Sequence, residues 1–162
     1  MRTMPLDYHA LSERYRPEQI TTLLVGEAPP PSGASYFYLP APLRVAANIG
    51  ENRSLPATVF YRYFKRLPSD TGEYESMLSA LKDRGVFLID ICDEPIRVRN
   101  HPPGLRRIVD EIPRFRARLA ARKLAVEDSA ITFLLARTTY RTILKAHFPE
   151  SNLIRWIDFR TG

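Results

Sequence analysis

The chain has 162 residues, which is enough for one domain with a hydrophobic core and short for two. Hydrophobic residues make up 44% and charged residues 26%, the ordinary balance of a soluble globular protein. No run of about 18 apolar residues occurs, which argues against a membrane span, and the N-terminal segment lacks the apolar centre of a signal peptide. We therefore expect a cytoplasmic protein.

The charge and the cysteine content narrow the function classes further. The net charge is +6, and 20 arginines stand against 4 lysines. Because the planar guanidinium group suits phosphate, the composition permits nucleic-acid binding, although a solvated basic surface is an equal alternative. The single cysteine, Cys92, excludes an internal disulfide and a cysteine-built metal or iron–sulfur site. It lies in the apolar run FLIDIC, so we expect a buried, unreactive thiol. We expect no metal and no cofactor.

Strand and helix patterns alternate along the chain. In order, we expect a helix over 6–15, a strand over 20–25, helices over 55–67 and 71–85, a strand over 86–91, a helix over 103–123 that is broken or kinked at Pro113, a strand over 130–136, a helix over 137–148 and a strand over 152–159. Asp70 or Thr71 is the start signal and Gly85 the stop signal of the helix between them.

The first three strand segments are nearly continuous apolar runs, the pattern of parallel strands that are covered on both faces. Together with the alternation, they predict one domain over 1–162. Its expected fold is a three-layer α/β/α sandwich around a short, mainly four-stranded parallel sheet.

Charged residues are expected where the strands end. Glu27, Asp90 and Arg137 follow or close the first three strands, and ligands of such sheets bind beyond the carboxyl ends of the strands. In the segment GEAPPPSGASYFY (26–38), prolines and aromatic residues follow Glu27, and a rigid loop loses little entropy on binding. These residues predict a pre-organised pocket wall. The plainer alternative is a surface glutamate or helix cap with aromatic residues that only pack.

The segment VGEAPP resembles the first motif of the uracil-DNA glycosylase superfamily, which reads Gly-Glu-Ala-Pro-Gly after a strand in the thermophile-type members. The match covers Gly26, Glu27, Ala28 and Pro29, and Pro30 replaces the last glycine. The segment over 85–115 is similar to the strand, the basic proline-containing loop and the helix that follow in the family. Strand order and loop lengths extend the resemblance over residues 20–159.

The resemblance implies a protein that binds nucleic acid, in particular DNA, or a nucleobase ligand, and that hydrolyses an N-glycosidic bond. Glu27 would orient water toward C1′ of a flipped-out nucleotide and balance the positive charge that grows on the sugar. The base would be held by Gly26, Ala28, Pro29, Tyr36, Phe37 and Asp90. The nucleic-acid backbone would be contacted by Arg97, Arg99, Arg106 and Arg107.

The chain departs from the family at three points. Asp90 stands where the family has a base-reading asparagine, and an ionised carboxylate only accepts hydrogen bonds. The family's histidine, proline and serine after the last strand are missing from RWIDFRTG, where Arg160 would be the substitute cation. The cluster-binding cysteines are also missing. His101 and His147 are expected to be surface or capping residues.

Two further functions stay open at this point. One is a nucleic-acid-binding or regulatory module that keeps the fold without catalysis, since the histidine is missing. The other is a hydrolase that acts on free nucleosides or small phosphorylated ligands, which would need no extended basic face. The arginines of the long helix, Arg114, Arg116, Arg118 and Arg122, are expected to form its solvated face.

Overall fold

The computed structural model describes residues 7–30, 36–40, 54–96, 102–124, 126–135 and 140–160. Four parallel strands form its sheet in the order β2-β1-β3-β4, namely β1 (Thr22–Gly26), β2 (Val86–Asp90), β3 (Ile131–Leu135) and β4 (Asn152–Arg155). Strands β1, β2 and β3 are almost wholly buried, in agreement with their nearly continuous apolar sequences. The predicted α/β fold with a four-stranded parallel sheet is confirmed.

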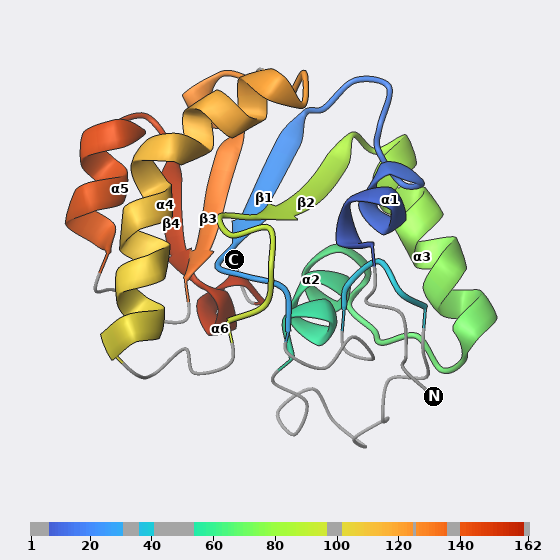
Figure 1. Ribbon diagram of the computed structural model, residues 1–162. Helices are drawn as coiled ribbons and strands as arrows, with labels where there is room; N and C mark the ends of the chain where they lie inside the picture. The colour runs from blue at the N-terminus through green and yellow to red at the C-terminus, as the bar shows by residue number, and fades with distance from the viewer. Residues whose placement is uncertain are drawn as a thin grey trace.

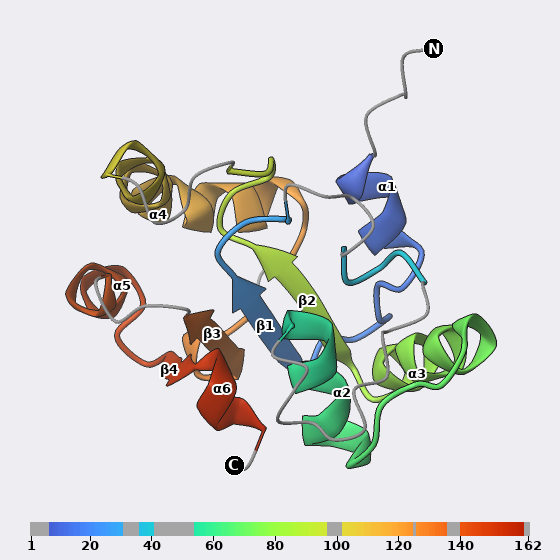
Figure 2. The same ribbon diagram turned by 90° about the horizontal axis from the view of Figure 1, so that it is seen from below.

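Helices pack on both faces of this sheet (Figures 1 and 2). They are α1 (Tyr8–Glu13), α2 (Leu55–Phe64), α3 (Thr71–Asp83), α4 (Pro102–Ala121), α5 (Arg141–His147) and α6 (Trp156–Phe159), with a 3₁₀ turn over Asp128–Ala130. Helices α4 and α5 lie on one side, and α2 and α3 on the other. One hydrophobic cluster runs through the three layers. Among the described residues, no helix has both the length and the apolar character needed to cross a membrane.

The boundaries of α3 follow its local chemistry. The side chain of Asp70 accepts a hydrogen bond from the Glu73 N–H at 2.7 Å, which caps the first turn. After the helix, Gly85 adopts a φ of +76°, a conformation in which a side chain would be strained. Both predicted signals are thus confirmed, and β2 begins at Val86, directly after Gly85.

Helix α4 runs through Pro113 without a break. Its axis nevertheless changes direction along its length in both views (Figures 1 and 2). Of the two predicted effects of Pro113, a break or a kink, the helix shows the kink. Proline removes one backbone donor, and its ring crowds the preceding turn.

The last predicted strand was too long. Strand β4 ends at Arg155, and the next residues form the short helix α6. Its last residue, Arg155, pairs with Leu135, the last residue of β3. The predicted helix over 137–148 begins at Arg141 in the structure, and residues 136–139 lie outside the described part.

Candidate functional site

The carboxyl ends of β1 and β2 lie side by side. Gly26 and Asp90 are register partners at the last position of the two strands. The pairing continues past the strands, because the Ile91 N–H donates to the Gly26 carbonyl at 2.9 Å and the Cys92 N–H donates to the Glu27 carbonyl at 3.0 Å. The backbone that carries Glu27 is therefore held in place by the segment after β2.

A cavity of about 190 Å³ opens at this end of the sheet, beside α2 and α6. Its walls are mainly apolar and are formed by Gly26, Glu27, Ala28, Pro30, Tyr36, Phe37, Ser54, Leu55, Pro56, Leu88, Asp90 and Trp156. The structure thus brings six of the predicted site residues around one cavity: Gly26, Glu27, Ala28, Tyr36, Phe37 and Asp90. Pro29 lines the neighbouring cavity instead. The function of these residues stays a prediction.

Glu27 is a buried carboxylate, with 6% of its surface exposed. The hydroxyl of Tyr140 donates a hydrogen bond to its Oε2 at 2.8 Å, and Tyr140 is fully buried just before α5. The expectation of a plain surface glutamate is therefore excluded. Sequence reasoning missed Tyr140, although it follows β3, the strand that neighbours β1, at the same edge of the sheet.

Asp90 lies against the backbone of β1. A Cβ atom placed on Gly26 would meet Asp90 Oδ1 at 2.5 Å, closer than any real contact. A side chain at this position would therefore have to displace the carboxylate of Asp90. One carboxylate oxygen thus lies beside the β1 backbone at the cavity wall, and Asp90 itself is partly exposed.

The predicted aromatic residues belong to the core. Phe37 stacks on Phe60 of α2, with ring centroids 5.5 Å apart, and its carbonyl accepts from the Tyr74 hydroxyl at 2.6 Å. The hydroxyl of Tyr36 donates to the Tyr8 carbonyl at 3.2 Å, and burial raises the pKa of Tyr36 well above its usual value. The packing interpretation of these residues is correct. Both also line the cavity, so packing makes them rigid walls.

Trp156 is a wall residue that sequence reasoning did not single out. It is the first residue of α6, directly after β4, and is partly buried. It thus occupies the region where the resemblance places a histidine.

The substitute cation, Arg160, is buried in the interior, where its Nε donates to Thr58 Oγ1 at 3.1 Å, and it does not line the cavity. His147 is exposed on α5, and its carbonyl accepts a hydrogen bond from Arg116. His101 lies outside the described residues.

A second cavity of about 360 Å³ lies between α1, the end of β2 and α4. It shares Tyr36 and Asp90 with the first cavity and is more polar, with His9, Ser12, Asp93, Arg118 and Arg122 among its lining residues. Cys92 also borders it. As expected, this cysteine is buried, and burial raises its pKa to about 11, so the reactive thiolate is disfavoured.

The arginines of α4 fall into two groups. Arg106 and Arg107 are exposed near its start, and Arg107 lies 3.6 Å from Glu94 in a solvent-exposed pair. Arg114 is also exposed. Arg97 and Arg99 lie outside the described residues, as does Arg137.

The expected solvated face of α4 is wrong for Arg118 and Arg122, which are only partly exposed, and correct for Arg114 and Arg116, which are exposed. Arg116 binds Asp128 at 3.1 Å, Arg118 binds Asp93 and the Ile91 carbonyl, and Arg122 binds Glu13 at 2.9 Å. These pairs connect α4 to the rest of the protein. The physical reason is that a long arginine side chain can lie along the protein surface and reach a distant carboxylate.

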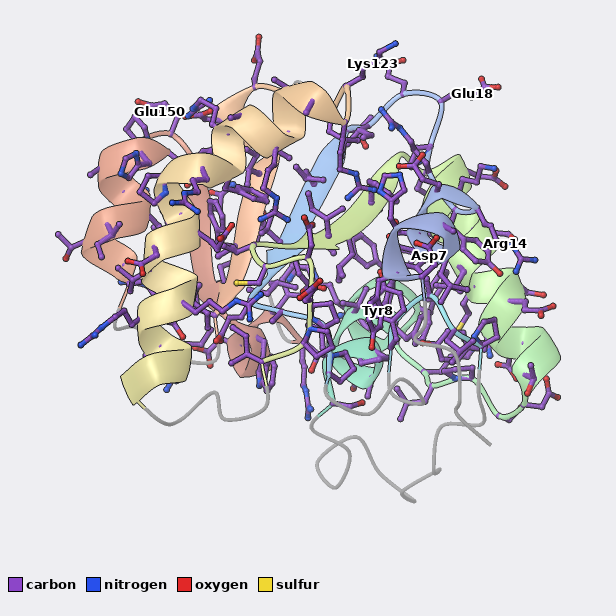
Figure 3. The ribbon with its side chains drawn as sticks, viewed as in Figure 1. Asp7, Tyr8, Arg14, Glu18, Lys123 and Glu150 are labelled. Carbon is purple, nitrogen blue, oxygen red and sulfur yellow. The ribbon has the colours of Figure 1, made fainter. Side chains whose placement is uncertain are left out.

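The opposite end of the sheet offers a contrast. There Glu18, Lys123 and Glu150 point outward into solvent (Figure 3). Within the described ranges, no group of three or more histidine, cysteine, aspartate and glutamate side chains could hold a metal ion.

No family model, curated protein or solved structure matches the chain.

Proposed function

We propose that this protein binds a nucleobase in the cavity at the ends of β1 and β2, and that it hydrolyses the N-glycosidic bond of that nucleotide in the manner of the uracil-DNA glycosylase superfamily. The observation that carries the proposal is Glu27, a buried carboxylate that lines an aromatic-walled cavity and accepts a hydrogen bond from Tyr140.

The chemistry of N-glycosidic cleavage suits such a carboxylate. As the bond from C1′ to the base lengthens, positive charge develops on the sugar, and a fixed negative group beside it stabilises the transition state. The stabilisation is larger where apolar walls keep water out. Glu27 would supply this charge and orient the attacking water, and Tyr140 would hold the carboxylate in position.

The size of the cavity favours a base over a larger ligand. Pockets for drug-sized molecules span roughly 300–1,000 Å³, whereas this cavity is about 190 Å³. A single base would fill it against Phe37 and Trp156, while its sugar stays at the mouth. Enzymes that act on bases in DNA take the target base out of the stack into such a pocket.

A polynucleotide partner is supported by the exposed arginines at the start of α4. Arg106 and Arg107 are exposed to solvent, and the pair of Arg107 with Glu94 lies at the surface, whereas Arg118 and Arg122 are partly buried in their ion pairs. They would contact phosphate groups next to the flipped nucleotide.

The experiment is a release assay. Single- and double-stranded oligonucleotides that carry uracil, hypoxanthine or an alkylated base are incubated with the protein, and the released base is measured by chromatography. We expect release from at least one lesion and none from the undamaged strand. If no lesion is released although the oligonucleotides bind, the hydrolysis part of the proposal fails.

A second candidate, the module without catalysis, is favoured by one observation. The last strand leads to Trp156, and the described residues over 140–160 contain a single histidine, the exposed His147. If this candidate is correct, the oligonucleotides bind in a salt-dependent way and no base is released from them. Binding that does not change with salt would count against nucleic acid and favour a small ligand such as a free nucleoside.

A further inference from the structure

Basic charge is concentrated on one side of the sheet. Helices α4 and α5 pack there next to each other (Figures 1 and 2), and together they carry seven arginine and lysine residues against two acidic residues. Helices α2 and α3 on the opposite side carry two basic and three acidic residues. The two pairs of helices thus contribute +5 and −1 to the net charge of +6. A polyanion is therefore expected to approach from the side of α4 and α5.

A groove of about 770 Å³ lies along α4 on this basic side and reaches Ile143 of α5. It is lined by Arg106, Arg107 and Arg114, and all three arginines are exposed. Helix α4 begins at the end of the sheet where the strands have their carboxyl ends (Figure 1). The groove therefore leads from the end of the sheet that carries the candidate site back along the helix.

The arginines of the groove are held only by pairs at the surface. Arg107 lies 3.6 Å from Glu94, and Arg114 lies 3.8 Å from Glu111, while 51% of the Arg107 side chain and 74% of the Arg114 side chain are exposed. Ion pairs that are exposed to this degree contribute little free energy. A phosphate group, which binds the guanidinium group through two oxygens, can therefore replace the carboxylate.

The lining of the groove favours a duplex over a single strand. Proteins that bind single strands stack the bases on aromatic side chains. Among the described residues, the uncharged side chains of the groove are Val109, Pro113 and Ile143, and none of them is aromatic. Arg106 and Arg114 are eight residues apart, which is about 12 Å along a helix. Phosphates of roughly three to four base pairs of a duplex span that length.

From these observations we propose that the groove between α4 and α5 binds the phosphate backbone of a nucleic-acid duplex, which extends from the mouth of the cavity along α4. The inference rests on the proposed function for its polynucleotide partner and adds a second contact surface. Arg106 and Arg107 contact phosphates near the flipped nucleotide, and Arg114 contacts phosphates further along the duplex.

The test measures the binding of an undamaged, dye-labelled DNA duplex by fluorescence anisotropy at several salt concentrations. Arg114→Gln removes one phosphate contact, so the slope of the logarithm of affinity against the logarithm of salt concentration should fall by about one. Asp110→Asn removes a negative charge from the same groove and should tighten binding by about 1.5- to 5-fold, the range of exposed charge pairs. A damaged fold would weaken binding in both variants, so opposite effects identify the groove itself.

Two variants on the other side of the sheet are the controls. Lys82→Gln and Glu75→Gln make the same changes of charge at exposed positions of α3. Both should bind the duplex like the wild type, because salt screens charges beyond about 10 Å.

The outcomes separate this inference from the proposed function. If the α4 variants behave like the α3 controls although the wild type binds the duplex, the inference is overturned and the proposed function stands. The same holds if the duplex does not bind but a base is released from a damaged oligonucleotide. If the protein neither binds DNA nor releases a base, both are overturned.

Discussion

At the scale of single residues, the site is built from pairs that hold one another. Glu27 is joined to Tyr140 across 113 positions of sequence, and Asp90 occupies the space that a side chain on Gly26 would need. Each pair connects a strand end to another part of the sheet edge. The carboxylate of Glu27 is therefore held by a residue distant in sequence, and that of Asp90 lies beside the backbone of the neighbouring strand.

The bond to Tyr140 is expected to stabilise the fold. Tyr140→Phe removes one donor from a buried carboxylate, so the free energy of unfolding should fall by about 1–3 kcal/mol. Chemical denaturation measures the change. Tyr61→Phe is the matched control, because no hydrogen bond of the Tyr61 hydroxyl occurs within the described residues, and it should change stability by less than about 0.5 kcal/mol. Equal effects of the two variants would contradict a specific role of this bond.

The buried thiol of Cys92 is expected to react slowly at neutral pH. Burial, with the nearby Glu111, raises the pKa of its thiol to about 11, so the thiol stays protonated until the pH approaches that value. Because the thiolate is the reactive form, a thiol reagent near neutral pH should modify the folded protein much more slowly than the unfolded protein. Fast modification of the folded protein, followed by absorbance, would show that the thiol is accessible and ionised.

At the scale of elements, the close contact between β1 and β2 can be tested at the strand ends. Gly26→Ala places a methyl group where Asp90 Oδ1 lies, and an overpacked site of this kind costs about 1–3 kcal/mol of folding free energy. The double variant with Asp90→Ala should recover part of the loss, which a double-mutant cycle measures. Gly72→Ala is the control, since its nearest described neighbour would lie at 3.4 Å. No recovery in the double variant would mean that Asp90 is not the obstacle.

The elements that could be predicted from sequence are those with strong local signals. The apolar runs predict β1, β2 and β3, and Asp70 and Gly85 mark the limits of α3. Helix α6 could not be predicted in this way, because its residues WIDF follow the strand residues NLIR without a glycine or proline to mark the boundary.

The candidate site was predictable to a similar degree. Strand ends brought Glu27 and Asp90 together as expected, because parallel strands end at one edge of a sheet. Tyr140 and Trp156 were missed, since neither stands in a motif and both reach the site through the arrangement of neighbouring strands. The arginines of α4 were assigned to solvent because helical spacing does not reveal partners that are distant in sequence.

At the scale of the whole molecule, some arginines of this basic protein are used in ion pairs within the fold and others are exposed to solvent. Arg118 and Arg122 are partly buried in ion pairs that connect α4 to other elements, whereas Arg106 and Arg107 are exposed to a partner. The cavity that Glu27 and Asp90 line is thus set within a basic protein. This arrangement would attract a polyanion and then place one of its bases beside carboxylates.

The salt dependence of DNA binding tests the role of these arginines. Arg106→Gln should weaken binding and lower the slope of the logarithm of affinity against the logarithm of salt concentration by about one. Arg14→Gln removes the same charge from an exposed position on the far side of the molecule and should leave the slope unchanged (Figure 3). A titration at several salt concentrations measures both. Equal slopes for the two variants would place the nucleic acid elsewhere.

The most direct test of the central claim is the rate of base release by Glu27→Gln with enzyme in excess over a substrate that the wild type cleaves. The substitution keeps the shape of the side chain and removes its charge, so we expect binding to change little and release to slow by at least about 100-fold. Glu94→Gln, at an exposed carboxylate outside the cavity, should cleave like the wild type. Release by Glu27→Gln at the rate of the wild type would contradict the claim that this buried carboxylate carries the chemistry.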